Sequence, residues 1–193
     1  MSLKEKYEKE IAPRMKKEHS LSNIMQVPRL KKIVVNAGIG DFRESKEAVE
    51  AFVDEMAAFL GQKPNPRQAR LSISGFKVRE GSVVGYSATL RGRIMWAFLE
   101  KLINIAIPRI RDFRGLNTNS FDNAGNYSLG ITEHVIFPEV NPNTVKGIRS
   151  LQLTLVSSSQ NKEVNKELLI NLGMPFDTTP PQGSTERREK GSK

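Results

Sequence analysis

Apolar side chains recur every three or four residues in four segments of the chain, and this spacing places them on one face of a helix. The predicted helices begin at Ser2, span residues 45–60 and 94–110, and close the fold at 165–172. Pro13 is expected to bend or end the first of them, because proline has no N–H to donate inside a helix.

The second and third helices carry the clearest apolar faces. Ser45 is the predicted N-cap of the second helix and Gly61 its left-handed stop, while Pro108 should disturb only the last turn of the third. The side chains that fall on the apolar faces are Val49, Phe52, Val53, Met56 and Leu60 on the second helix, and Trp96, Leu99, Ile103, Ala106 and Ile110 on the third.

Short β-branched or alternating segments between the helices predict strands. They lie at residues 30–36, 69–73, 83–91, 127–131 and 151–157. Because strands and helices are mixed without regular alternation, we expect a two-layer α+β fold in which an antiparallel sheet has its helices on one face. The other face of such a sheet is left open.

The chain has 193 residues, of which 38% are hydrophobic, and this predicts a single domain over residues 1–176. After Phe176 the sequence turns polar and rich in threonine and proline, so residues 177–193 are predicted to form a disordered tail. No apolar run approaches the roughly 20 residues of a membrane span, and we expect a cytoplasmic protein with no membrane partner. The absence of cysteine excludes disulfides and thiolate nucleophiles.

Positive charge is concentrated in one part of the chain. The sequence has 30 Lys and Arg against 21 Asp and Glu, a formal net charge of +9. Residues 63–114 hold 11 basic and 3 acidic side chains, so this segment alone contributes +8. Its many arginines suit bidentate contact with phosphate, which predicts a polyanionic partner. A solvated basic face without function is the alternative interpretation.

Several side chains in and near this segment have two possible roles. Phe76 and Phe113 lie among the basic residues, where each is either a ring for an unstacked base or an apolar anchor. Asn36, Gln62 and Thr89 stand at the ends of predicted strands or helices. There they either contact sugar hydroxyls or cap the chain, and their spacing leaves both roles open.

Catalytic chemistry finds little support in the sequence. His19 and His134 have no neighbouring metal-ligand spacing, and we interpret both as exposed or packed histidines. Gly38 and Gly40 follow a strand, but Arg43 stands where a dinucleotide-binding loop needs another glycine. We therefore expect no enzyme, no cofactor and no metal site. An enzyme that holds an anionic substrate and a binder of anionic membranes are the disfavoured alternatives.

Eight short motifs follow one another between residues 27 and 176, and the resemblance that they carry covers about residues 3–176. They are VPxLxKIVVN at 27–36, GQKP at 61–64, SGFKxRxG at 74–81, TLRG at 89–92, PRxRDFRG at 108–115, GNYSLG at 125–130, FPE at 137–139 and LGMPF at 172–176. With these motifs the sequence resembles the bacterial large-subunit ribosomal protein L5 family. The resemblance implies an RRM-like two-layer α+β fold that binds 5S rRNA in the central protuberance of the large subunit.

The resemblance also implies partners and site residues. The partners are 5S rRNA, 23S rRNA, peptidyl-site tRNA, the small-subunit ribosomal protein S13 and other 5S rRNA-binding ribosomal proteins. The tRNA contact is implied for a projecting loop at residues 72–85, with Ser74, Gly75, Phe76, Lys77 and Arg79 as candidates. The family's RNA-contacting positions look like Asn36, Gln62, Thr89 and Arg91, on a sheet face without the paired aromatic residues of RRM domains. With their neighbours, the candidate RNA-binding residues are Asn36, Gln62, Lys63, Arg67, Arg70, Thr89, Arg91 and Arg93.

Overall fold

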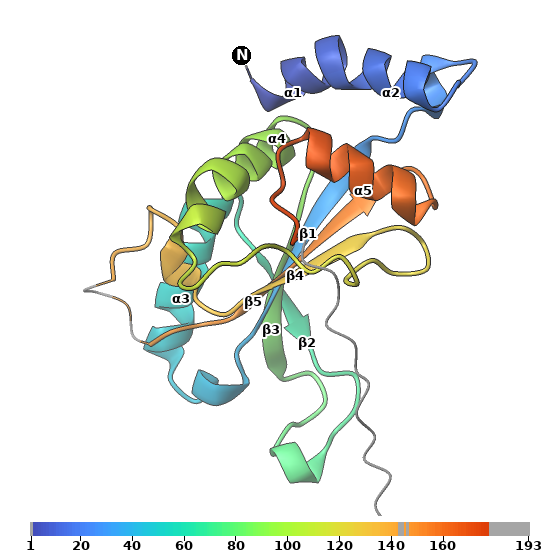
Figure 1. Ribbon diagram of the computed structural model, residues 1–193. Coiled ribbons are helices and arrows are strands. Elements are labelled where there is room, and N and C mark those ends of the chain that lie inside the picture. Colours follow the sequence, from blue (N-terminus) through green and yellow to red (C-terminus); the bar gives the residue numbers. More distant parts are fainter. Residues whose placement is uncertain (1, 143–144, 146, 178–193) are drawn as a thin grey trace, which may run out of the picture.

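The structure, a computed structural model, describes residues 2–142, 145 and 147–177 of the chain. Its centre is an antiparallel sheet with the strand order β2-β3-β1-β5-β4 (Figure 1). The strands are β1 (Leu30–Gly38), β2 (Asn65–Gln68), β3 (Val83–Leu90), β4 (Tyr127–Ile131) and β5 (Leu151–Ser157). The tail predicted at 177–193 lies outside the described residues, apart from Asp177.

Helices pack against this sheet, which confirms the predicted two-layer α+β fold. The α-helices are α1 (Leu3–Lys6), α2 (Ala12–Glu18), α3 (Lys46–Leu60), α4 (Gly92–Lys101) and α5 (Lys162–Asn171). A π-helical turn (Tyr7–Ile11) joins α1 to α2, and another (Leu102–Ala106) extends α4 into a 3₁₀ turn (Ile107–Arg109). Further 3₁₀ turns lie at Ile24–Gln26, Gly40–Phe42, Ser74–Phe76 and His134–Ile136.

Alternation along the strands decides which face of the sheet the helices cover. On β1, Ile33 and Val35 are fully buried while Asn36 is exposed, and on β5 the exposed Gln152 lies between two buried leucines. Successive strand residues point to opposite faces, so the apolar set faces the core and the polar set faces away from it. The core therefore lies between the sheet and the layer that contains α3 and α4.

Helix α3 begins and ends where the sequence predicts. The hydroxyl of Ser45 accepts a hydrogen bond from a backbone N–H of the first turn, and Gly61 closes the helix with φ +69°. All of the predicted apolar face is buried except Val49, which is half-buried. Phe59, which the apolar spacing did not single out, is also buried and stacks on Phe137 with ring centroids 4.5 Å apart.

The buried stripe of α4 is displaced by about one residue from the predicted face. Met95 and Leu102 are fully buried, whereas Trp96 and Ile103 of the predicted face are half-buried. Trp96 packs against Tyr7 of the N-terminal helix instead, with ring centroids 5.6 Å apart. Spacing predicts that the helix is amphipathic, but the angle at which it rests on the sheet depends on what packs beside it.

Pro13 does not end the first helix, contrary to one of the two predicted effects. The chain continues from α1 into α2 through a π-helical turn, in which the N–H of Ala12 donates to the carbonyl of Tyr7. A π-helical turn moves the hydrogen-bond pattern by one residue. Because this change comes just before Pro13, the missing N–H falls in the first turn of α2, where a helix tolerates proline.

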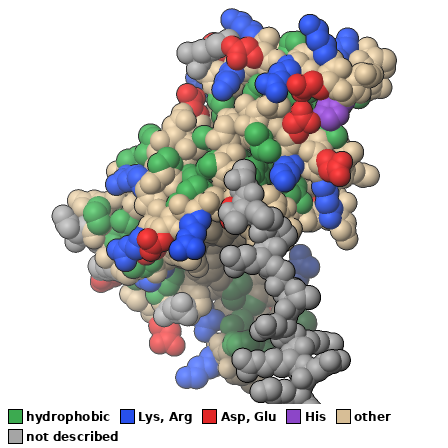
Figure 2. All heavy atoms as spheres, viewed as in Figure 1, with side chains coloured by type: hydrophobic (Ala, Val, Ile, Leu, Met, Phe, Trp, Pro, Cys, Tyr) green, Lys and Arg blue, Asp and Glu red, His purple; other side chains and the backbone are tan. Residues whose placement is uncertain are grey.

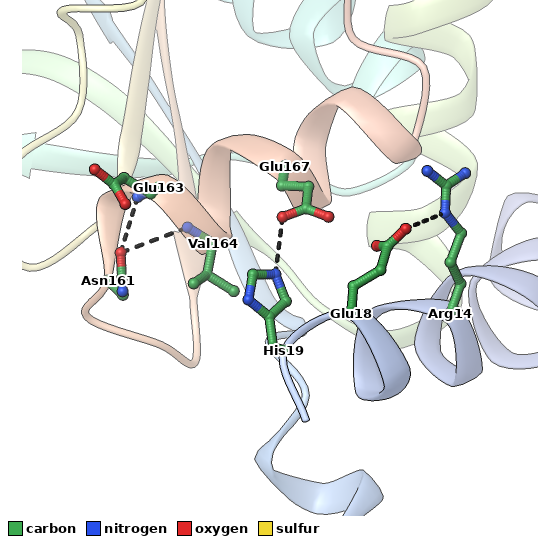
Figure 3. A network of polar contacts seen from close by, with 7 residues as sticks. All are labelled: Arg14, Glu18, His19, Asn161, Glu163, Val164 and Glu167. Atoms are coloured by element: carbon green, nitrogen blue, oxygen red, sulfur yellow. Dashed lines mark hydrogen bonds and ion pairs between the residues drawn. The ribbon is translucent and has the colours of Figure 1, made fainter. Parts of the chain in front are cut away.

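Polar contacts tie the end of the N-terminal helix to α5 (Figure 3). Nε2 of His19 lies 2.8 Å from a carboxylate oxygen of Glu167. Nε of Arg14 donates to Glu18 at 2.9 Å, and this hydrogen bond holds the pKa of the Glu18 carboxyl below its ordinary value. Asn161 caps α5 by accepting two backbone N–H groups, so the helix begins three residues earlier than predicted.

The strand predicted at residues 69–73 is wrong, and β2 occurs just before it. β2 is an exposed edge strand that pairs with β3 from Asn65, opposite Ser87. Pro66 is tolerated because an edge strand can lack one ladder hydrogen bond. All four β2 residues are exposed, so the strand has no alternation of polar and apolar residues that a pattern could reveal.

The opposite edge of the sheet is covered by the chain itself. Phe121 forms an isolated antiparallel bridge with Tyr127 of β4. The N–H of Ser128 donates to the carbonyl of Ser120 at 3.0 Å. The loop before β4 therefore lies along that strand and uses part of its outer hydrogen-bonding capacity.

Candidate nucleic-acid interface

We call the side of the sheet that points away from the core the open face. Directly paired residues of antiparallel strands point to the same side. One row of paired residues crosses all five strands and consists of Asn65, Ser87, Asn36, Gln152 and Gly130. A second row beside it consists of Thr89, Val34, Thr154 and Ser128. The open face is thus made mainly of amide and hydroxyl side chains.

Positive charge borders these rows. Lys32 on β1 and Arg67 on β2 are the cations of the open face, and its described strand residues include no acidic or aromatic side chain. Nε of Arg67 donates to the hydroxyl of Ser87 at 2.5 Å, which fixes the guanidinium group beside β3. Such a surface attracts phosphate and offers hydrogen bonds to sugars and base edges, but it has no ring on which a base stacks.

A shallow depression of about 700 Å³ lies on the open face. Its polar and glycine lining includes Asn36, Gly38, Ser120, Ser128, Gly130 and Gln152. Glycine leaves the backbone accessible at two of these positions, so a ligand can approach the strands closely. The depression extends across β1, β5 and β4, which makes it wide and shallow rather than an enclosed pocket.

The structure does not bring all eight predicted RNA-binding residues together on one surface. Asn36, Arg67 and Thr89 lie on the open face, where Asn36 and Arg67 are exposed and Thr89 is half-buried. Gln62 and Lys63 precede β2, and they lie near the end of β3 because the two strands are antiparallel.

Arg91 lies at this end of the sheet, whereas Arg93 belongs to the first turn of α4 and lies beside Leu3 and Trp96. Arg91 follows β3 with an extended backbone and precedes the first turn of α4, and both arginines are exposed. Arg70 lies beyond the opposite end of β2, so it does not join this group.

A projecting loop, residues 69–82, connects β2 to β3 and extends from the sheet (Figure 1). The loop predicted at 72–85 ends at Ser82, because Val83 already belongs to β3. Ile73 and Val78 form a two-residue bridge near its tip. One link to the rest of the protein is the bond from Nη2 of Arg43 to the carbonyl of Lys77, 2.9 Å long.

The loop carries exposed apolar and basic side chains together. Leu71 is 73% exposed and Phe76 is 75% exposed, and the basic Arg70, Lys77 and Arg79 are exposed as well. Ser74, Gly75 and Phe76 form a 3₁₀ turn at the tip. Phe76 is therefore not an anchor of the core. Phe113, in contrast, is partly buried and packs against the core.

The central basic segment does not form one continuous footprint. Nζ of Lys101 donates to the carbonyl of Phe59 at 3.0 Å and pairs with Glu139, so its charge is used inside the fold. Three further arginines, Arg109, Arg111 and Arg114, lie after α4 and belong to neither the open face nor the projecting loop. The sequence correctly shows that residues 63–114 carry most of the excess positive charge, but it does not show how this charge is divided among separate surfaces. Figure 2 shows basic and acidic side chains interspersed over one side of the molecule rather than gathered in a single patch.

Sequence reasoning missed several residues of the open face. Ser87, Ser128 and Gln152 face the same side as Asn36 but were not singled out. A signal was present for Gln152, because it alternates with leucines in the strand predicted at 151–157. Ser87 carried no such signal, since its place depends on pairing with strands remote in sequence.

Both histidines hold elements of the fold together. His134 is fully buried, and its Nδ1 accepts the backbone N–H of Arg149 at 3.1 Å. Its Nε2 therefore carries the hydrogen and donates to Glu55 on α3, also at 3.1 Å. His19 pairs with Glu167 as described above. Sequence reasoning missed both partners because each glutamate is remote along the chain.

Two classes of site are not seen in the described part of the chain. No group of three or more histidine, aspartate or glutamate side chains within it is placed to hold a metal ion. None of its helices is both long and apolar enough to span a bilayer. A two-layer α+β fold with a polar and basic open sheet face is typical of nucleic-acid-binding proteins.

Comparison with known proteins gives the family. Residues 23–79 match the family described as Ribosomal protein L5, and residues 83–176 match the C-terminal part of the same ribosomal family. The chain is 47% identical over 174 residues to large ribosomal subunit protein uL5 of Rubrobacter xylanophilus, covering 90% of this chain and 97% of the relative. It is 46% identical over 176 residues to uL5 of a Synechococcus species, covering 91% and 98%.

The chain therefore belongs to the ribosomal protein L5 family, as the eight motifs indicated. The uL5 protein of Thermotoga maritima is a further relative, 48% identical over 174 residues, with 90% of this chain and 95% of the relative covered. The family is a structural, non-enzymatic component of the large ribosomal subunit, and its members are found with the ribosomes of the cytoplasm.

Proposed function

We propose that this chain binds 5S rRNA on the open face of its sheet, in the central protuberance of the large subunit. The observation that carries the proposal is the row of paired polar residues that crosses the sheet through Asn36, with Lys32 and Arg67 beside it. Amide and hydroxyl groups are suited to ribose hydroxyls and base edges, and the two cations are suited to phosphates.

The absence of an aromatic pair favours one mode of recognition over another. RRM domains bind single-stranded bases by stacking them on aromatic side chains of the sheet. The described strand residues on this open face offer no ring for such stacking. The chain therefore recognises a folded RNA by its backbone and its exposed edges, as a structured 5S rRNA presents them.

The projecting loop is the proposed contact with peptidyl-site tRNA. Lys77 and Arg79 are exposed and available for phosphates, and Phe76 is an exposed ring that can rest against a nucleotide. The loop leaves the sheet at the end away from Arg91, so it can reach a second RNA while the open face is occupied. The distance between the loop and the open face supports two simultaneous contacts, one with tRNA and one with 5S rRNA.

Further contacts are proposed from family membership alone. They are a bridge to the small subunit through ribosomal protein S13, contact with 23S rRNA, and proximity to other 5S rRNA-binding ribosomal proteins. No group of residues in this chain is assigned to the S13 bridge.

The test of 5S rRNA binding is an affinity measurement on two matched pairs of variants. Asn36→Ala should weaken binding about five- to tenfold, the usual value of one or two hydrogen bonds, and Arg67→Gln should weaken it more because its bond to phosphate is charge-assisted. Asn104→Ala and Lys9→Gln are the controls, since both residues are exposed and lie on helical segments. Equal losses in a variant and its control would contradict the assignment of the open face.

A further inference from the structure

Three arginines lie within six residues at the end of the helical segment that α4 begins. Arg109, Arg111 and Arg114 are all exposed. Within the described part of the chain none of their guanidinium groups has an ion-pair partner. Asp112 is the only acidic residue between them. Unpaired arginines grouped in this way are available to a partner outside the chain.

The backbone that carries these arginines is held in place by apolar anchors. Ile110 and Phe113 are partly buried against the core, and Leu116 is fully buried. Asp112 has φ +53°, an uncommon conformation that turns the chain between two anchors. Because every third residue points inward, Arg111 and Arg114 are left exposed between the anchors, and the exposed Arg109 directly precedes the first of them.

A second constraint clamps the end of this segment. The N–H of Leu116 donates to the carbonyl of Pro175 at 2.8 Å, and the N–H of Asp177 donates to the carbonyl of Leu116 at 3.0 Å. A Cβ on Gly115 would lie 2.6 Å from the backbone of Asp177, so the two chain segments are in close contact there. Less side-chain and backbone freedom is lost on binding when a cationic site is held in this way.

The segment that carries the three arginines packs its apolar side chains against the core side of the sheet, away from the open face. The hydroxyl of Tyr127 donates to the carbonyl of Asn117, just beyond them, at 3.0 Å. Tyr127 is buried on the core side of β4, whereas its neighbour Ser128 belongs to the open face. The segment that follows α4 therefore packs on the core side of the sheet.

We infer that Arg109, Arg111 and Arg114 form a second RNA-binding surface that takes the phosphates of a helical RNA segment other than the one on the open face. An RNA duplex is too stiff to wrap from one side of a small domain to the other, so the two surfaces engage two segments. Arginine forks match phosphate oxygens, and phosphates are the groups that a structural protein of the large subunit meets most often. The inference rests on the proposed function only for the identity of the RNA on the open face.

The test uses the full chain saturated with unlabelled 5S rRNA. A labelled RNA hairpin of about 16 base pairs is then titrated in, and its binding is followed by fluorescence anisotropy. The triple variant R109Q/R111Q/R114Q should bind the hairpin at least about tenfold more weakly, with a salt slope reduced by roughly 2 to 3. Its affinity for 5S rRNA should change by less than about twofold, because the open face is intact.

A control variant, K6Q/K9Q/K17Q, removes the same charge from exposed lysines of the N-terminal helix. It should weaken hairpin binding by less than about threefold, and thermal unfolding should show that both variants are folded. The inference is overturned if the two variants lose equal affinity, if the arginine variant loses 5S rRNA, or if the wild-type complex does not bind the hairpin. Displacement of the hairpin by poly-glutamate at equal charge concentration would also overturn it, in favour of an acidic protein partner.

Failure of this inference can be told from failure of the proposed function. Hairpin binding is also measured without 5S rRNA, in the variant Arg67→Gln and in the arginine triple variant. If no variant or wild-type protein binds 5S rRNA, the assignment of the open face fails while the dependence of hairpin binding on the three arginines still stands.

Discussion

The open face and the projecting loop are adjacent along the chain, because the loop connects β2 to β3. The two regions are nevertheless built in different ways. On the open face, strand pairing fixes each side chain, and Ser87 holds Arg67 in place. In the loop, Leu71 and Phe76 are exposed, and few contacts lead back to the core. A rigid array of side chains suits a stably bound RNA, whereas an exposed loop tip with few contacts to the core suits a transiently bound partner.

The largest expected difference is in the free energy of unfolding of two glycine-to-alanine variants, one in each region. A Cβ at Gly85 of β3 would lie 2.7 Å from the carbonyl oxygen of Ala37, whereas a Cβ at Gly75 meets no atom within 4 Å. Gly85→Ala should lower the free energy of unfolding by about 2–3 kcal/mol, because β1 and β3 must move apart. Gly75→Ala should change it by less than about 0.5 kcal/mol. Urea unfolding of both variants checks this, and similar losses would show that the loop is as constrained as the sheet.

A smaller difference is expected between the two phenylalanines of the basic segment. Phe113→Ala should lower the free energy of unfolding by about 1–2 kcal/mol, because its ring is partly buried against the core. Phe76→Ala should leave it within about 0.5 kcal/mol, since that ring is 75% exposed. Thermal denaturation in parallel measures both, and a destabilised Phe76 variant would mean that the tip packs on the domain in solution.

Shortening the loop separates its role from that of the open face. Replacement of residues 74–80 by two glycines should cost less than about 1 kcal/mol of stability, because the ends of the loop stay paired. Binding of 5S rRNA should change less than about twofold. Retention of peptidyl-site tRNA by ribosomes that carry the variant should fall. Loss of 5S rRNA binding by the folded variant would place the loop in the same site as the sheet.

The smallest expected effect is on the pH dependence of folding stability, and it involves the turn that precedes β4. The side-chain amide of Asn126 donates to Asp122 at 2.8 Å, and with two backbone N–H groups it keeps the pKa of this carboxyl below its ordinary value. A lowered pKa in the folded state stabilises the protein above the ordinary pKa of aspartate, about 3.9, and this contribution is lost as the pH falls through the folded value.

Asp122→Asn should therefore show a smaller loss of stability between about pH 5 and pH 3 than the wild type in urea unfolding. Binding of 5S rRNA at neutral pH should be unchanged, since Asp122 lies in the loop before β4 rather than on the open face. An unchanged pH dependence would mean that these hydrogen bonds are absent in solution.

Much of the fold could be predicted from spacing alone, because burial imposes periodicity on helices and central strands. The caps at Ser45 and Gly61 and the strands at 127–131 and 151–157 agree with the structure. The edge strand β2 could not be predicted in the same way, since all its residues are exposed. The candidate site was predicted less completely, because Ser87 acquires its place on the open face only through pairing with a strand that is remote in sequence.

The two edges of the sheet determine how the chain behaves before it meets RNA. Before a protein binds its partner, the unpaired backbone N–H and C=O groups at the edges of its sheet can pair with strands of other chains. Here one edge is a four-residue strand with a proline and an arginine, and the other is partly occupied by the chain's own loop. Short, charged, proline-containing or covered edges resist the addition of a foreign strand. Both edges of the sheet are therefore poor templates for the addition of a strand from another chain.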